Sequence, residues 1–159
     1  MSVNYFFGDG YLDVAINGND FGTEVTVGRY DSLNGLVMKG DEKGNFIPLS
    51  ILQSGMYIPG NGKALVTLQG SKGNYLMTAS QNKGALKVFE LKRDDTIIHL
   101  KPLDESAIIT YQNGKKQKRE IGYGSSFLSQ SGRFITIDKN VVSVAIKNNK
   151  GEVRNVSLQ

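Results

Sequence analysis

The stretch KALVTLQGSKGNYLMTASQNKGALKVFELK, residues 63 to 92, decides the fold of this chain. It contains three runs in which apolar and polar residues alternate, and a period of two is typical of strands that bury one face. The intervening residues 70–74 and 82–84 are rich in glycine and asparagine, which tolerate positive φ in tight turns. We therefore predict an antiparallel meander with strands over residues 63–69, 75–80 and 86–92.

The same pattern extends to both ends of the chain, and no window carries the sustained i, i+3, i+4, i+7 apolar spacing of a helix. We therefore predict an all-β protein built as an antiparallel meander. The further expected strands cover residues 11–17, 35–39, 45–51, 97–102, 107–112, 117–123, 133–138, 141–147 and 153–158. Residues 41–44, 113–114 and 148–151 have the composition of tight turns.

Composition bounds the classes of protein to which the chain can belong. Its 159 residues fit one domain or two small β units, and 39% of them are hydrophobic. Cysteine is absent, which excludes disulfides, thiolate zinc sites and cysteine nucleophiles. The first residues lack the basic start and apolar run of a signal peptide, so the leader of an exported protein would lie upstream. No stretch reaches the roughly 18 apolar residues of a membrane helix, and we predict no transmembrane segment.

The net charge is +4, and the run KKQKR at residues 115–119 raises the question of nucleic-acid binding. The run follows Asn113-Gly114, a typical hairpin turn, and precedes an expected strand. Basic residues at such a place solvate a sheet edge and discourage pairing between edges. No aromatic residues are interleaved with the run, as stacking on single-stranded bases would require. We predict no nucleic-acid partner.

Two longer irregular stretches, residues 18–34 and 53–62, are candidate binding loops, because loops of this length are uncommon without a role. Their candidate recognition residues are Tyr30, Asp31, Tyr57 and Asn61. The other interpretation, which we adopt, is that both stretches are connections that pack their own tyrosines.

Groups for acid-base catalysis are sparse. His99 is the only histidine, and alternation places it on the strand face opposite its apolar neighbours. The acidic pairs Asp94-Asp95 and Asp104-Glu105 lie in turn-like stretches, whereas glycoside hydrolysis needs two carboxyl groups about 5–10 Å apart in a cleft. We predict that the chain is not an enzyme, with a carbohydrate-active hydrolase domain that uses dispersed Asp and Glu as the alternative.

Several motifs carry a resemblance to known families. GDGYLDV at residues 8–14 resembles the signature of FG-GAP/VCBS repeats, and GDEKGNF at residues 40–46 is similar to the hairpin that follows it in such repeats. REI at residues 119–121 and GSSFLSQS at residues 124–131 resemble the central motif of the ASPIC/UnbV domain.

These resemblances imply one to two β-propeller-like blades over residues 1–93 and a small ASPIC/UnbV-like β module over residues 94–159. They imply a non-catalytic binding or scaffold module of a bacterial exported or cell-surface protein; they do not identify its ligand, for which a polysaccharide and a protein are the two candidates.

The repeat family also implies a calcium loop with oxygen ligands at its first, third, fifth and ninth positions. When Asp9 takes the fifth position, Asp13 takes the ninth, and Tyr5 and Phe7 occupy the first and third. Two carboxylates are too few for tight calcium binding. The alternative, which we favour, is a tight turn in which Asp9 and Asp13 accept hydrogen bonds from backbone amides. We therefore expect no cofactor and only weak calcium binding.

Two further expectations concern packing. Phe127-Leu128 is expected to be an apolar plug in an irregular loop, and the nearby serines are expected to bond backbone groups. Propeller blades bury their faces only against neighbouring blades, and two blades leave apolar faces uncovered. We therefore expect self-association through the N-terminal unit or further propeller blades upstream of this chain.

Overall fold

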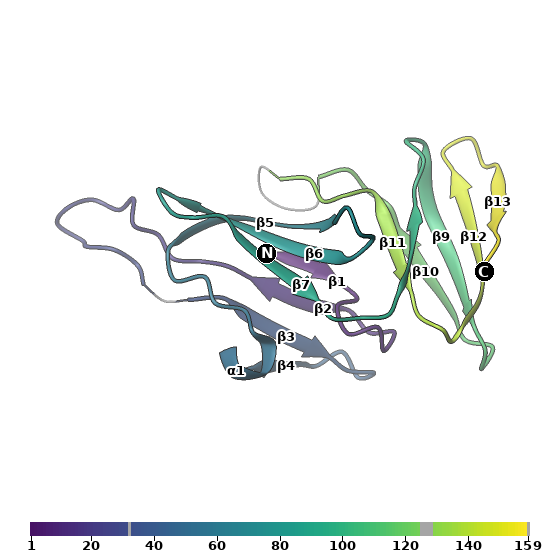
Figure 1. Cartoon of the computed structure of the whole chain (residues 1–159), viewed down its shortest axis with the longest axis horizontal. Coiled ribbons are helices and arrows are strands. Elements are labelled where there is room, and N and C mark those ends of the chain that lie inside the picture. Colours follow the sequence, from purple (N-terminus) through teal and green to yellow (C-terminus); the bar gives the residue numbers. More distant parts are fainter. Residues whose placement is uncertain (32, 125–128, 159) are drawn as a thin grey trace. The chain divides into compact units, whose positions relative to one another are not determined.

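A computed structural model describes residues 1–31, 33–124 and 129–158 and confirms the all-β class with antiparallel pairing (Figure 1). The elements in chain order are β1 (Ser2–Asn4), β2 (Asp13–Ile16), β3 (Leu36–Gly40), β4 (Phe46–Leu49), α1 (Ile51–Ser54), β5 (Asn61–Gln69), β6 (Tyr75–Asn82), β7 (Lys87–Leu91), β8 (Thr96–His99), β9 (Asp104–Tyr111), β10 (Lys116–Glu120), β11 (Phe134–Ile137), β12 (Val141–Asn148) and β13 (Val153–Val156). Every predicted strand overlaps one of these, so alternation located the strands well.

The chain forms two compact units. The first unit consists of Met1–Arg93 together with Gly124–Gly132, and the second consists of Asp94–Tyr123 together with Arg133–Gln159. The excursion around residue 131 belongs to the first unit because it bonds to β5. Thr67 N–H donates to Ser131 Oγ at 3.0 Å, and Gly132 N–H donates to Thr67 O at 2.7 Å.

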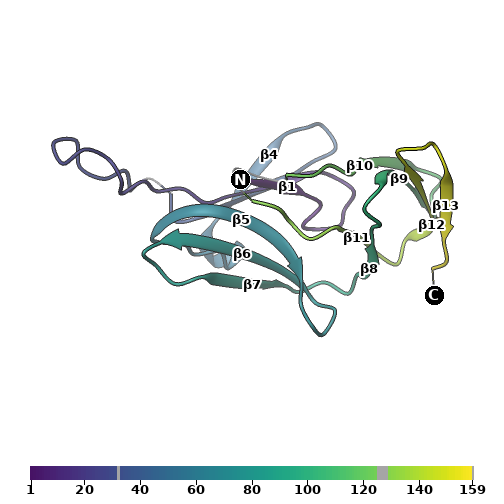
Figure 2. The same ribbon diagram turned by 90° about the horizontal axis from the view of Figure 1, so that it is seen from above.

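The first unit contains two antiparallel sheets, with strand orders β1-β2-β3-β4 and β5-β6-β7. In Figure 2 the strands β5, β6 and β7 run side by side as one curved sheet. Fully buried side chains of both sheets and of the loop after α1 form the core, because apolar area removed from water stabilises the unit. The largest of its fully buried apolar side chains are Ile58 and Leu65.

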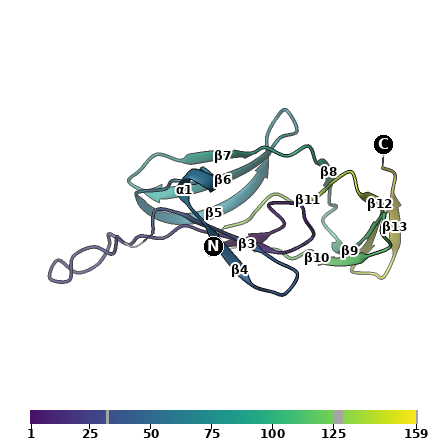
Figure 3. The same ribbon diagram turned by 90° about the horizontal axis from the view of Figure 1, so that it is seen from below.

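The second unit has a four-stranded sheet of order β10-β9-β12-β13 and a two-stranded sheet of β11 and β8 (Figure 3). The inward-facing positions of β9, β12, β8 and β11 gather in one apolar cluster. Its members are Ile98, Ala107, Ile109, Ile135, Ile137, Val141, Val144 and Ile146. The outer strands β10 and β13 have no fully buried member in this cluster, although the partly buried Val156 of β13 packs against it.

Four hairpins close through one common turn. In each of them a glycine with a φ between 79° and 85° occupies the last position, and its own N–H donates to the carbonyl three residues earlier, which gives a type I turn followed by a bulge. These glycines are Gly44, Gly73, Gly114 and Gly151. A side chain at such a φ is strained, so the glycine-containing turns predicted from the sequence are confirmed where they were expected.

Two short elements were missed. The strand β1 has only three residues, too few to show alternation. The helix α1 carries a capping box: Gln53 N–H donates to Ser50 Oγ, and Ser50 N–H donates to Gln53 Oε1 at 2.9 Å. The spacing Ser50-x-x-Gln53 was the signal that could have revealed it.

None of the sheets formed by the described residues closes on itself, and a propeller-like arrangement of blades is not shown.

Within the part of the chain that the structure describes, no helix has the length and apolar character needed to span a membrane.

Candidate functional site

Asp13, a candidate calcium ligand, is fully buried and uses both carboxylate oxygens to hold backbone amides. Phe7 N–H donates to Oδ2 and Gly40 N–H donates to Oδ1, each at 3.0 Å. Burial raises the pKa of the Asp13 carboxyl above its ordinary value, although the bonds from Gly40 and Phe7 oppose the rise. Gly40 must be glycine, because a Cβ atom there would lie 2.0 Å from Leu12 O.

Asp9 lies on the surface beside this bond network. Its Oδ1 accepts a hydrogen bond from Tyr11 N–H at 3.1 Å, and its Oδ2 lies 3.1 Å from Lys39 Nζ. Lys39 Nζ also lies 5.4 Å from the centre of the Phe7 ring. Among residues 1–31, 33–124 and 129–158, no group of three or more His, Cys, Asp or Glu side chains is arranged to hold a metal ion. The loop therefore has the geometry of the backbone-bonded turn.

We expect millimolar calcium to change the melting temperature by less than about 1 °C, because stabilisation follows RT ln(1 + [L]/Kd) and Kd is large when few oxygens are available. Thermal melts followed by circular dichroism, with and without calcium, test this. A rise of several degrees that Asp9→Ala abolishes would contradict it.

The candidate recognition residues of the two loops differ in how exposed their side chains are. Tyr30 and Tyr57 are 58% and 48% exposed, so the expectation that both stretches pack their own tyrosines is wrong. The Asp31 carboxylate lies 2.7 Å from Arg29 Nη2. Asn61, however, is only 4% exposed within β5, so this candidate does not lie on an exposed surface. A strand position that faces the core buries its side chain whatever its polarity.

The two side chains of the acidic pair Asp104-Glu105 lie on opposite faces of β9. Asp104 is buried, and its Oδ2 accepts bonds from Arg154 Nη2 at 2.6 Å and Lys101 N–H at 2.7 Å. Glu105 is exposed, because successive residues of a strand point to opposite faces. Their side chains therefore cannot act together on one bond.

His99, Asp94 and Asp95 lie near the start of the second unit. His99 is exposed on β8 whereas its neighbour Ile98 is buried, as alternation predicted. Asp94 and Asp95 belong to the connection between β7 and β8.

The basic run follows the hairpin turn at residue 114 and forms most of β10, an edge strand, as predicted. Two of its charges are engaged locally: Lys118 Nζ lies 2.6 Å from Glu120, and Arg119 Nη1 donates to Thr136 O at 2.9 Å. The predicted plug at Phe127-Leu128 lies outside the described residues.

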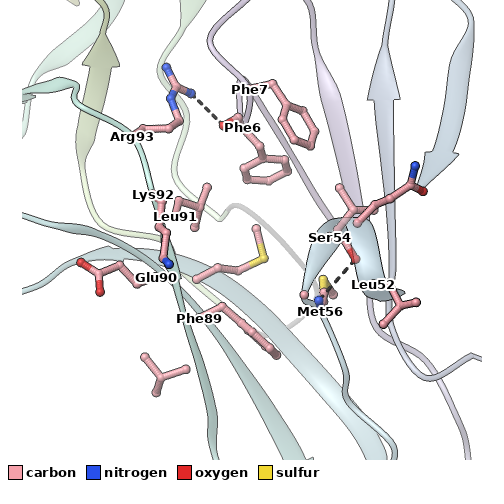
Figure 4. A pocket seen from close by; sticks show the side chains of 15 residues that line it. Phe6, Phe7, Leu52, Ser54, Met56, Phe89, Glu90, Leu91, Lys92 and Arg93 are labelled. Carbon is pink, nitrogen blue, oxygen red and sulfur yellow. Dashed lines mark hydrogen bonds between the residues drawn. The ribbon is translucent and has the colours of Figure 1, made fainter. Parts of the chain in front are cut away.

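The first unit carries a feature that sequence reasoning missed, an apolar groove of about 740 Å³, which is within the range of ligand sites. Its floor consists of side chains that are at most 7% exposed and that come from both sheets and the loop after α1. They include Phe6, Val37, Met56 and Met77. Figure 4 shows the ring of Phe6 and the thioether of Met56 beside the groove.

The helix α1 and the strand β7 form the two walls. Leu52 of α1 is 97% exposed and Val88 of β7 is 55% exposed, while Phe89 and Leu91 are half-buried on the β7 side (Figure 4). Apolar side chains left exposed around a hollow usually mark an interaction surface. The groove brings together residues more than 80 positions apart, which explains why no local motif revealed it.

The backbone of β7 adds polar groups to this wall. Among the described strands, β7 pairs only with β6, so one of its edges presents unpaired N–H and C=O groups. One of the two edge strands of the other sheet, β4, contains Pro48, which removes one donor, and the other, β1, has only three residues. The edge of β7 contains no proline and is therefore better suited to pair with an added polypeptide.

Charged side chains stand at one end of the groove. Arg93 Nη1 donates to Tyr5 O and Phe6 O at 2.5 and 2.9 Å, which ties the end of β7 to the loop that contributes the floor. Glu90 accepts a bond from Asn74 Nδ2 at 3.0 Å. Lys92 is exposed. The described lining residues thus combine an apolar floor with the charged groups of Glu90, Lys92 and Arg93 at one end.

No protein-family model matches this chain, and no curated protein matches it either.

Proposed function

We propose that this chain is a non-catalytic binding module whose groove takes the apolar side chains of a polypeptide segment laid along β7. The observation that carries the proposal is that an apolar groove lies beside the edge of β7, which among the described strands has no neighbouring strand on that side. Strand addition obtains affinity from backbone hydrogen bonds, and pockets for alternate side chains supply specificity.

A protein ligand suits this groove better than a polysaccharide. Its floor is formed by Phe6, Val37, Met56 and Met77, all at most 7% exposed. A sugar would leave its hydroxyl groups without partners on such a floor, and burying an unpaired hydroxyl costs roughly 1–3 kcal/mol in proteins. Apolar side chains meet no such cost.

The resemblance to FG-GAP/VCBS repeats and to the ASPIC/UnbV domain supports the wider part of the proposal. On that basis the module belongs to a bacterial exported or cell-surface protein, and its first unit corresponds to propeller-like blades. The order β1-β2-β3-β4, a meander of four strands, supports the blade assignment because a blade has about four.

A labelled heptapeptide, Thr-Val-Glu-Val-Thr-Val-Thr, tests the groove, because alternate valines lie on one face of an extended chain. We expect fluorescence anisotropy to give a Kd of roughly 10–100 μM, since a short segment buries much less than 1,200 Å². A panel of neutral oligosaccharides should not compete. Absence of peptide binding at millimolar protein would refute the proposal.

The matched variants are Leu52→Glu in the groove wall and Leu86→Glu outside the groove. Leu52 is 97% and Leu86 63% exposed, so neither change disturbs the core. We expect Leu52→Glu to weaken peptide binding at least tenfold and Leu86→Glu to leave it unchanged.

A further inference from the structure

A long loop of the first unit, which we call the arm, projects away from both sheets in all three overall views (Figures 1, 2 and 3). Its limits are set by a bridge in which Asp20 N–H donates to Tyr30 O at 2.8 Å and Tyr30 N–H donates to Asp20 O at 2.7 Å. The arm is therefore residues 20–30.

The root of the arm is held firmly. Asn19 is 6% exposed with φ 114°, and its Oδ1 accepts a bond from Leu33 N–H at 2.8 Å. Its Nδ2 lies 3.2 to 3.3 Å from the side-chain oxygen of Asn34 and the carbonyls of Pro59 and Gly60. These bonds tie both ends of the arm to the start of β5 and present it at a defined place.

The tip of the arm carries apolar side chains that the described residues do not cover. Val27 N–H donates to Glu24 O at 3.0 Å, which closes a turn with Val25 at its apex. Val25 is 101% exposed and Val27 is 58% exposed. Farther back, the guanidinium of Arg29 lies 4.8 Å from the centre of the Phe21 ring and stiffens the stem.

We propose that the arm of one copy inserts its tip into the groove of a second copy, an inference that rests on the binding function proposed above. The tip offers two uncovered valines, and the groove offers an apolar floor with exposed walls. Charge supports the fit, since Glu24 stands beside Val25 at the tip and exposed Lys92 stands at the end of the groove. The long CDR3 loops of nanobodies insert into concave epitopes in a comparable way.

Sedimentation velocity on the full chain between about 1 and 300 μM tests the inference, because a small interface gives weak association in this range. We expect concentration-dependent association. Val25→Asp in the arm and Leu52→Glu in the groove should each weaken it at least tenfold, and Leu103→Glu in the second unit should not. All three side chains are exposed, so folding is preserved.

Mixing the two variants provides the sharper test. The Val25→Asp chain retains an intact groove and the Leu52→Glu chain retains an intact arm, so the mixture should form a heterodimer that neither variant forms alone. Failure of the mixture to associate, or a wild-type chain that stays monomeric up to 300 μM, overturns the inference.

The two proposals fail separately. If the heptapeptide binds the groove but the chain stays monomeric, the binding function stands and another protein is the occupant. If the chain associates equally well with Val25→Asp, the arm is not the inserted segment. If the heptapeptide does not bind and the chain stays monomeric, both proposals fall.

Discussion

Replacing Asp13 with alanine is expected to lower the free energy of unfolding by about 3–4 kcal/mol, the combined loss of two hydrogen bonds to a buried carboxylate. The backbone amide of Gly40 would lose its acceptor in a buried site, and that of Phe7 would lose its acceptor in a partly buried one. The loss is smaller than the simple sum, because the substitution also removes the cost of burying a charge.

Denaturant unfolding followed by circular dichroism measures the change in the free energy of unfolding of the protein. Hydrogen exchange at the Phe7 and Gly40 amides measures how much the protection of these two groups falls. Asp41→Ala is the matched control, because Asp41 also accepts bonds from two backbone amides, of Lys43 and Asn45, but at an exposed turn. Water replaces those bonds, so a much smaller loss is expected there. Equal losses for the two variants would show that burial of Asp13 has no special role.

The second large effect is expected for Arg154→Ala in the second unit. The substitution leaves the buried Asp104 carboxylate with its bond from Lys101 N–H but without its charged partner. Breaking a buried pair costs about 3–5 kcal/mol, and we expect about 2–4 kcal/mol because the Arg154 side chain is 33% exposed and partly screened.

This effect depends on pH. Burial by itself raises the pKa of Asp104, but the bonds and charges of Arg154 and Lys101 outweigh it and hold the pKa below its ordinary value of 3.8. A lowered pKa in the folded state stabilises the protein above the unfolded pKa, and this stabilisation is lost as the pH falls through the folded pKa. The difference in the free energy of unfolding between wild type and Arg154→Ala should therefore be large at pH 7 and small near pH 2.

Unfolding curves at several pH values measure the free energy of unfolding, and an NMR titration of the Asp104 carboxyl measures its pKa. Asp104→Asn is the companion variant. In a protein that already carries Asp104→Asn, Arg154→Ala should lower the free energy of unfolding by less, because no buried charge is left unpaired. A difference between wild type and Arg154→Ala that stays constant from pH 7 to pH 2 would mean that Arg154 acts through packing alone.

The sequence by itself determined the fold class, the strands and their tight turns. Alternation reports which strand residues face a core, and a glycine such as Gly44 or Gly114 reports a positive φ that other residues adopt only with strain. Both signals lie within a few residues of the element they describe. The strand β1 and the helix α1 were missed because each is too short to show a period.

Only the tertiary structure decided which polar side chains are buried and which surfaces stay open. The sequence favoured backbone amides as the partners of Asp13 but did not show which ones, and the structure places the amides of Phe7 and Gly40 on its carboxylate. Asp104 meets Arg154 across 50 positions, and the floor of the groove joins Phe6 to Met77. Burial and pairing depend on neighbours that are distant in the chain, and no local pattern encodes which distant residues meet.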